Sequence, residues 1–129
     1  MPEFVSTPEQ GDGWAVGSID GMGDGPGFRK VRGELGVEEL GINAIVLAPG
    51  APGRRHSHER QEEIYFCHSG QLQIEFGDGS VRVLGPGGFA RVAAPTVRMI
   101  SNPGDTETTI VVIGAEGGYV GRDGVIADS

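Results

Sequence analysis

Residues 50–70 read GAPGRRHSHERQEEIYFCHSG, and the arrangement of this stretch predicts how the chain folds. The glycines and proline at its start and the Ser-Gly at its end are turn signals, and they enclose two short runs typical of β-strands. Because side chains alternate along a strand, His56 and His58 leave the same face of the first run. Glu63 opens the second run, with Tyr65 on the same face. We therefore expect two paired strands that bring two imidazoles and one carboxylate together.

The sequence on either side continues as short strands and turns. Residues 71–76 (QLQIEF) alternate polar and apolar side chains, which is the pattern of a half-buried strand, and Asp78-Gly79 is a hairpin signal. The best helix signal, at 33–40, is too short and too rich in glycine for more than one turn. Turn signals recur about every ten residues, so the pattern predicts an all-β sandwich or barrel. Further β-rich runs lie at 42–47, 80–84, 89–93, 96–101 and 106–115.

Composition and charge argue against several classes of protein. The chain has 129 residues, of which 24 are glycine, and its formal net charge is −8. The length fits one domain, and no apolar run approaches the roughly 18 residues that a membrane span requires. The first residues lack the basic and apolar regions of a secretory signal, and the acidic balance argues against nucleic-acid binding. A single cysteine, Cys67, cannot form an internal disulfide, so we expect a reducing cytoplasm.

His56, His58 and Glu63 form a reasonable donor set for a divalent transition metal. Imidazole suits several such ions, and we expect Mn, Fe, Ni or Zn, among which the sequence does not choose. The alternative is that both histidines are surface residues of a polar strand. The chain has only three histidines, and the placement of these two favours a site. The third, His68, lies on the opposite face from Glu63 by strand parity, so we interpret it as an outer-surface or interface residue.

Two short patterns resemble the sequence motifs of the cupin superfamily. The first consists of Gly50, five residues, His56-x-His58, four residues, Glu63, six residues and Gly70. The second is weaker and consists of Gly85-Pro86-Gly87 followed by Val97, Arg98 and Asn102. The resemblance covers about residues 40–115. It implies an all-β, double-stranded jelly-roll barrel of the cupin type.

The second motif departs from the cupin pattern at Arg98, which stands where the family has a metal-binding histidine. Arginine is always protonated and carries only donors, so it cannot ligate a metal. In one outcome, His56, His58 and Glu63 hold a metal with open positions, and Arg98 presents its guanidinium to an anionic ligand. In the other, Arg98 pairs with Glu63 in place of the metal. That second outcome leaves a metal-free cupin that binds a small anion or sugar, or one with a structural role alone.

The expected ligand is a small polar or anionic molecule, with Arg98, Tyr65 and Gln61 as candidate contacts. Tyr65 lies on the inner face of its strand, and Gln61 lies in the turn before it. The sequence does not decide whether the chain is an enzyme. If it is one, the resemblance implies oxidation or isomerisation of a small organic molecule at open metal positions.

The sequence predicts one barrel with glycine-rich arms. We expect a loosely structured N-terminal arm at 1–27, the barrel at 28–115 and a C-terminal arm at 116–129. Small cupins commonly dimerise, so the resemblance implies a homodimer. The outward parity of Ile64 and Phe66 supports this expectation, because apolar residues on an outer face need cover. We expect neither a nucleic acid nor a membrane as a partner.

Overall fold

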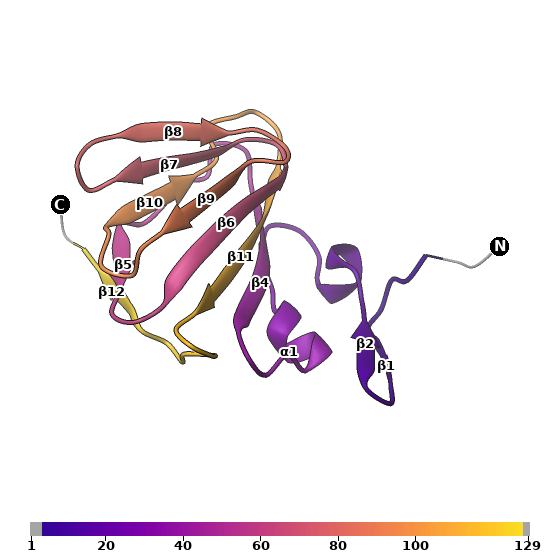
Figure 1. Cartoon of the computed structure of the whole chain (residues 1–129). Coiled ribbons are helices and arrows are strands. Elements are labelled where there is room, and N and C mark those ends of the chain that lie inside the picture. Colours follow the sequence, from indigo (N-terminus) through magenta and orange to yellow (C-terminus); the bar gives the residue numbers. More distant parts are fainter. Residues whose placement is uncertain (1–3, 128–129) are drawn as a thin grey trace.

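Two five-stranded antiparallel sheets face each other in the computed structural model, which describes residues 4–127 (Figure 1). One sheet runs β12 (Gly124–Ile126), β5 (His56–His58), β10 (Arg98–Ser101), β7 (Leu72–Phe76) and β8 (Val81–Leu84). The other runs β3 (Gly27–Arg29), β4 (Gly41–Leu47), β11 (Thr108–Ala115), β6 (Glu62–Ser69) and β9 (Phe89–Val92). The fold is therefore the all-β jelly-roll barrel that the sequence predicted.

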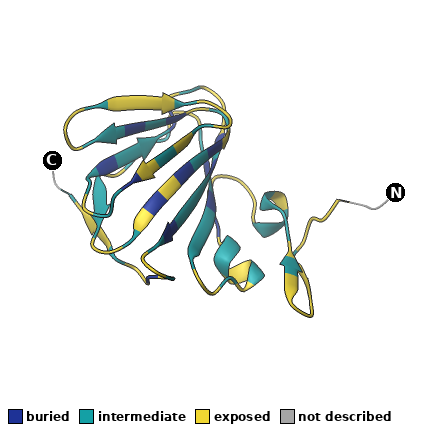
Figure 2. Ribbon diagram, in the orientation of Figure 1, coloured by how far each residue is buried: buried dark blue, intermediate teal, exposed yellow. Residues whose placement is uncertain are grey.

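Strand alternation places the predicted inner residues inside the barrel. Along β6, Glu63, Tyr65 and Cys67 are buried, whereas Ile64 between the first two is exposed (Figure 2). The strand ends at Gly70, whose φ of 79° favours glycine and whose α-carbon faces Thr108 too closely for a side chain. The position therefore needs glycine for two reasons, its backbone angle and its lack of space.

The expectation that the two site strands pair with each other is wrong. β5 pairs with β10 and β12, whereas β6 pairs with β11 and β9 in the opposite sheet. Residues 59–61 cross from one sheet to the other, and strand parity says nothing about such a crossing because it describes one strand at a time. The two sheets face each other, so the inner side chains of β5 and β6 still converge.

Apolar side chains from both sheets fill the barrel beside the site. The buried cluster consists of Tyr65, Cys67, Leu72, Ile74, Val92 and Ile110. The Cys67 thiol is free and fully buried, and burial raises its pKa. Cys67 is therefore a small interior side chain of the barrel core.

The N-terminal segment is more ordered than its glycine content suggested. It contains a hairpin of β1 (Glu9–Gly11) and β2 (Trp14–Val16), which projects away from the barrel in Figure 1. The 3-10 helix η1 (Ile19–Met22) follows, and the buried Arg29 side chain donates hydrogen bonds to the carbonyls of Ile19, Gly25 and Gly27. One arginine thus satisfies backbone groups that the glycine-rich segment could not pair by itself.

Helix α1 (Val31–Leu35) begins two residues before the stretch in which a single turn was expected, 33–40, and is capped by Gly36, which has a φ of 70°. In the described part of the chain, no helix has the length and apolar character needed to cross a membrane. Residues 1–3 and 128–129, at the outer ends of the two predicted arms, lie outside the described residues.

Candidate metal centre

His56, His58 and Glu63 come together inside the barrel. One potential ligand atom from each lies within 4.8 Å of those of the other two. Zinc-bound nitrogen and oxygen atoms lie about 2.0–2.2 Å from the ion, so small side-chain rotations would let one ion reach all three. The three residues that the sequence singled out could therefore form a metal site.

Both histidines have an acceptor for the proton on one ring nitrogen. Nδ1 of His56 lies 3.0 Å from the carbonyl oxygen of Arg54, and Nδ1 of His58 lies 2.7 Å from Oδ1 of Asp123. A carbonyl or a carboxylate can only accept, so Nδ1 carries the proton in each ring. Nε2 is then the ring nitrogen of each histidine that is left for a metal ion, and in His58 it lies 3.1 Å from Oε1 of Glu63. This hydrogen-bonding pattern is typical of histidines that ligate a metal.

Oε1 of Glu63 is the point at which the polar groups of the site meet. It accepts a hydrogen bond of 2.6 Å from the Tyr65 hydroxyl and one of 3.0 Å from the Arg98 guanidinium. Nε2 of His58 lies 3.1 Å from the same oxygen. Burial, then the charge of Glu63 and the hydrogen bond to it, raise the pKa of Tyr65 far above its usual value. The Tyr65 hydroxyl is therefore a neutral donor, engaged with Glu63 rather than open to a ligand.

Arg98 is fully buried and occupied. Besides its bond to Glu63, it donates to the carbonyl oxygens of Ala93, Ala94 and Thr96, the last at 2.7 Å, and its Nε lies 3.4 Å from the Tyr65 hydroxyl. Its position near Glu63 in the interior agrees with the sequence prediction. A free guanidinium offered to an anionic ligand is not what the structure contains, because Arg98 is fully buried and most of its donors are bound to these partners.

Asp123 is the site residue that sequence reasoning missed. Its carboxylate accepts hydrogen bonds from His58, from the backbone N–H groups of Arg60 and Gln61 and from the Gln61 side chain. Burial raises the pKa of Asp123, but these hydrogen bonds outweigh it and hold the pKa well below its usual value. The carboxylate is therefore ionised. The only sequence signal was an acidic residue, one of three in the glycine-rich tail, which does not identify a partner 65 positions away.

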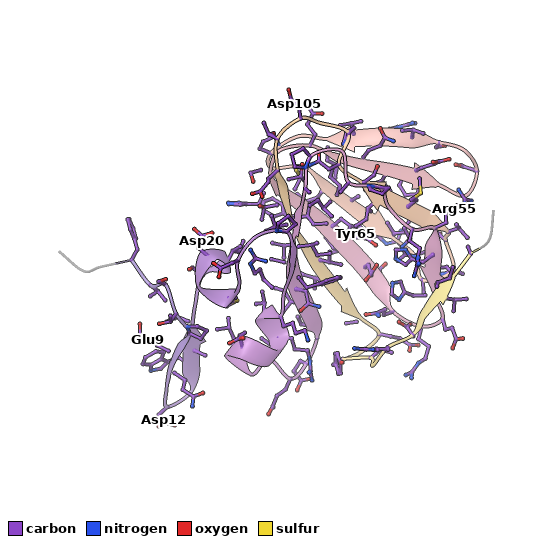
Figure 3. The ribbon with its side chains drawn as sticks, turned by 180° about the vertical axis from the view of Figure 1, so that it is seen from behind. Glu9, Asp12, Asp20, Arg55, Tyr65 and Asp105 are labelled. Atoms are coloured by element: carbon purple, nitrogen blue, oxygen red, sulfur yellow. The ribbon has the colours of Figure 1, made fainter. Side chains whose placement is uncertain are left out.

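A cavity of about 350 Å³ opens beside the three candidate ligands. Figure 3 shows Tyr65 inside the barrel and Arg55 near its rim. Gln61 lines the cavity, packs over Gly114 and donates to Asp123, so it supports the site as well as facing it. Arg122 also lines the cavity, is exposed, and makes no ion pair with any residue from 4 to 127. Most of the remaining wall is apolar, formed by Phe28, Ile42, Ile45, Ile100, Val112 and Val120.

Comparison with known proteins identifies a family model and similar folds. Residues 44–114 match the model described as a cupin domain, and no curated protein matches the chain. A sugar phosphate isomerase of the cupin superfamily from Silicibacter pomeroyi aligns with a TM-score of 0.67 and 23% identity, over 92% of this chain and 68% of that one.

Two further solved structures show the same fold. An uncharacterized conserved protein with a double-stranded β-helix domain from Klebsiella pneumoniae aligns with a TM-score of 0.62 and 21% identity, over 70% of this chain and 76% of that one. A DMSP lyase from Ruegeria pomeroyi aligns with a TM-score of 0.60 and 21% identity, over 69% of this chain and 43% of that one. At these identities the similarity establishes the fold alone.

Proposed function

This chain belongs to the cupin domain family, and on that premise we propose that it binds a divalent transition metal and a small molecule in its barrel. The ligands are Nε2 of His56, Nε2 of His58 and a carboxylate oxygen of Glu63. The ion is Mn, Fe, Ni or Zn, all of which accept imidazole and carboxylate together. The second molecule is small and polar or anionic.

The observation that carries the proposal is the hydrogen bonding of the two histidines. Each places its Nδ1 against an acceptor outside the ligand set, which leaves Nε2 as the nitrogen for the metal ion. Two surface histidines would have no reason to share this arrangement beside a buried carboxylate. Such outer partners fix the tautomer and the orientation of metal-binding histidines.

Three protein ligands leave positions open for a substrate, which is the arrangement of catalytic metal sites. When bound, the metal would supply a Lewis acid that polarises a ligand oxygen. The side chains orient the ligands and shield the bound molecule from water. Arg98 and Tyr65 orient Glu63 through its Oε1, and the apolar wall excludes water from the bound molecule.

We propose Arg122 as the contact for an anionic group, in place of Arg98, because Arg122 lines the cavity and is exposed. Gln61 lines the same cavity and completes the ligand site, and Tyr65 lines it too while its hydroxyl stays bound to Glu63. The cavity volume of about 350 Å³ suits a small metabolite.

The reaction class we favour is isomerisation or oxidation of such a molecule, and the description of the Silicibacter pomeroyi relative as a sugar phosphate isomerase supports the first.

A second candidate function rests on the ion pair between Arg98 and Glu63. Their atoms lie 3.0 Å apart, and the Arg98 side chain is fully buried. This pair gives Glu63 a countercharge without a metal, so a metal-free cupin that binds a small anion or sugar is the alternative. A cation held this close to Glu63 also lowers the affinity of the site for a metal ion.

The experiment that separates the two is metal content per chain, measured by elemental mass spectrometry on protein purified without a histidine tag. Near-stoichiometric Mn, Fe, Ni or Zn in the wild-type chain, lost in His56→Ala, supports the metal site. His68→Ala is the matched control, because His68 is exposed on the outer face of β6 and its loss should leave metal content unchanged. A wild-type chain that stays below stoichiometry after addition of each ion refutes the metal proposal.

We also propose that the chain is a homodimer in the cytoplasm. Phe89 on β9 is 67% exposed, and its ring lies 4.6 Å from that of Phe66 on the outer face of the sheet. Ile64 is exposed on the same face of β6. These side chains form an apolar patch that a second copy would cover. The free, buried Cys67 thiol supports a reducing compartment.

A further inference from the structure

Residues 116–126, which we call the C-terminal strap, form one wall of the site. Its last strand, β12, pairs with β5, so that Gly124 lies opposite His58 and Ile126 lies opposite His56 (Figure 1). Tyr119, Val120, Gly121 and Arg122 of the strap line the cavity. The strap therefore lies along the strand that carries both histidines and also covers the space beside them.

Asp123 is the strongest link between the strap and the barrel. Its side chain is 6% exposed, and its Oδ1 lies 2.7 Å from Nδ1 of His58. Oδ2 accepts the backbone N–H groups of Arg60 at 2.8 Å and Gln61 at 2.9 Å. The Asp123 carbonyl oxygen accepts the N–H of Glu59 at 3.1 Å. One strap residue thus holds His58 and the whole connection that crosses to the opposite sheet.

The other side-chain contacts of the strap are weaker. Glu116 pairs with Arg60 at 2.9 Å, but both side chains are more than half exposed, and pairs of this kind contribute little. Arg32 of α1 lies 3.5 Å from the centre of the Tyr119 ring, a cation–π contact at the near end of the strap. Among the described residues of the strap, Asp123 is the one whose side chain forms a hydrogen bond with a candidate metal ligand.

We infer that Asp123 is a positioning residue for the metal centre, and that through its bond to His58 metal binding and docking of the strap are coupled. The inference rests on the proposed metal-binding function. When the strap is docked, Asp123 fixes the His58 proton on Nδ1 and aims Nε2 at the ligand set. When the strap is undocked, His58 loses that acceptor, its ring is free to rotate, and either nitrogen can carry the proton.

Coupling of this kind works in both directions. If docking of the strap raises the affinity for metal, metal must favour the docked strap by the same factor. A bound ion would therefore close the cavity wall that carries Val120 and Arg122. The small-molecule site would then have all of its walls mainly when metal is bound.

The test measures Co²⁺ affinity and the visible absorption spectrum of the bound Co²⁺ for the wild-type chain, Asp123→Ala and Asp123→Asn. We expect Asp123→Ala to bind about 10–100-fold more weakly, the usual effect of removing an outer partner of a metal-bound histidine. Its spectrum should also change, because His58 no longer has a fixed orientation. Asp123→Asn keeps an oxygen for His58 but turns an amide NH2 group toward the N–H donors of Arg60 and Gln61, so we expect a smaller loss of affinity.

Glu116→Gln is the matched control, since it changes a strap residue that contacts Arg60 and none of the ligands. It should bind Co²⁺ as the wild type does, with the same spectrum. Hydrogen–deuterium exchange at Gly124–Ile126 supplies the reciprocal measurement. Exchange should slow when Co²⁺ binds the wild type, and it should not slow in Asp123→Ala.

The outcomes distinguish this inference from the proposed function. A wild-type chain that binds no Co²⁺ refutes the metal site, and the coupling to metal with it. A wild-type chain that binds Co²⁺ while Asp123→Ala binds it equally well, with the same spectrum, overturns the inference and leaves the metal site standing. Unchanged strap exchange on Co²⁺ binding to the wild type would also overturn it.

Discussion

Replacement of Arg98 by methionine should destabilise the metal-free protein strongly. The guanidinium of Arg98 is fully buried and donates to Glu63 and to three backbone carbonyl oxygens. Methionine fills much of the same volume but donates nothing. Arg98→Met therefore leaves the Glu63 carboxylate, in a residue that is only 8% exposed, without its cation.

Removing one partner of a buried ion pair costs about 3–5 kcal/mol, because the remaining charge is uncompensated. We expect the lower end of that range, about 3 kcal/mol. Glu63 borders the cavity and keeps its hydrogen bond from Tyr65, so water and the phenol partly compensate for the lost guanidinium. For a chain of this size the loss corresponds to a fall in Tm of roughly 10 °C.

The assay is thermal unfolding in the presence of a chelator, followed by the same measurement with added Mn²⁺ or Zn²⁺. Metal should raise the Tm of Arg98→Met more than that of the wild type, because the ion supplies the missing countercharge to Glu63. The double variant with Glu63→Gln removes both charges. In a double-mutant cycle, the two sites should show a coupling energy of at least about 1 kcal/mol.

Two results would refute this reasoning. If the Tm of Arg98→Met in chelator stays within about 3 °C of the wild-type value, the guanidinium is not needed to hold the Glu63 charge. If the single effects simply add in the double variant, Arg98 stabilises the three backbone carbonyls rather than the carboxylate. Either result would mean that the Arg98–Glu63 ion pair does not replace the metal, and the metal-free function would lose its support.

Three further predictions concern other parts of the molecule. Arg98→His should raise the affinity for Mn²⁺ or Zn²⁺, measured by calorimetry, because it adds the fourth ligand of the cupin pattern; unchanged or weaker binding would contradict it. Gly70→Ala should lower the Tm measured by circular dichroism, since the φ of 79° and the contact with Thr108 leave no room for a methyl group; Gly121→Ala is the control, with open space at that position. Phe89→Glu should convert a dimer to a monomer in sedimentation experiments with no change in fold, and a wild-type monomer would refute the proposed homodimer.

The fold and the three candidate ligands could be predicted because both depend on local rules. Alternation along β6 places Glu63 and Tyr65 on the same face of whatever sheet the strand joins. The observed burial along β6 alternates in this way. Gly70 signals a turn through its own backbone requirement. A motif of this kind is therefore readable within about twenty residues of sequence.

The features that could not be predicted from the sequence depend on contacts between distant parts of the chain. Whether β5 and β6 pair or face each other is decided by β10, β11 and β12, not by the residues between them. Asp123 reaches His58 across 65 positions, and no periodic pattern connects the two. The interior position of Arg98 was predictable from the motif, but its three carbonyl partners lie in a turn whose shape the sequence does not specify.

On the proposed function, Arg98 and Asp123 together would explain how a cupin keeps a metal site with one ligand fewer. Arg98 occupies the place of the missing histidine and holds Oε1 of Glu63, so the carboxylate keeps its position when no ion is bound. Asp123 holds His58 from the opposite side of the ring. If the chain binds metal as proposed, the ligand set is organised before the ion arrives, which reduces the entropy lost on binding. The same guanidinium repels the incoming ion. The two effects oppose each other, and a site that binds metal reversibly is the consequence we expect.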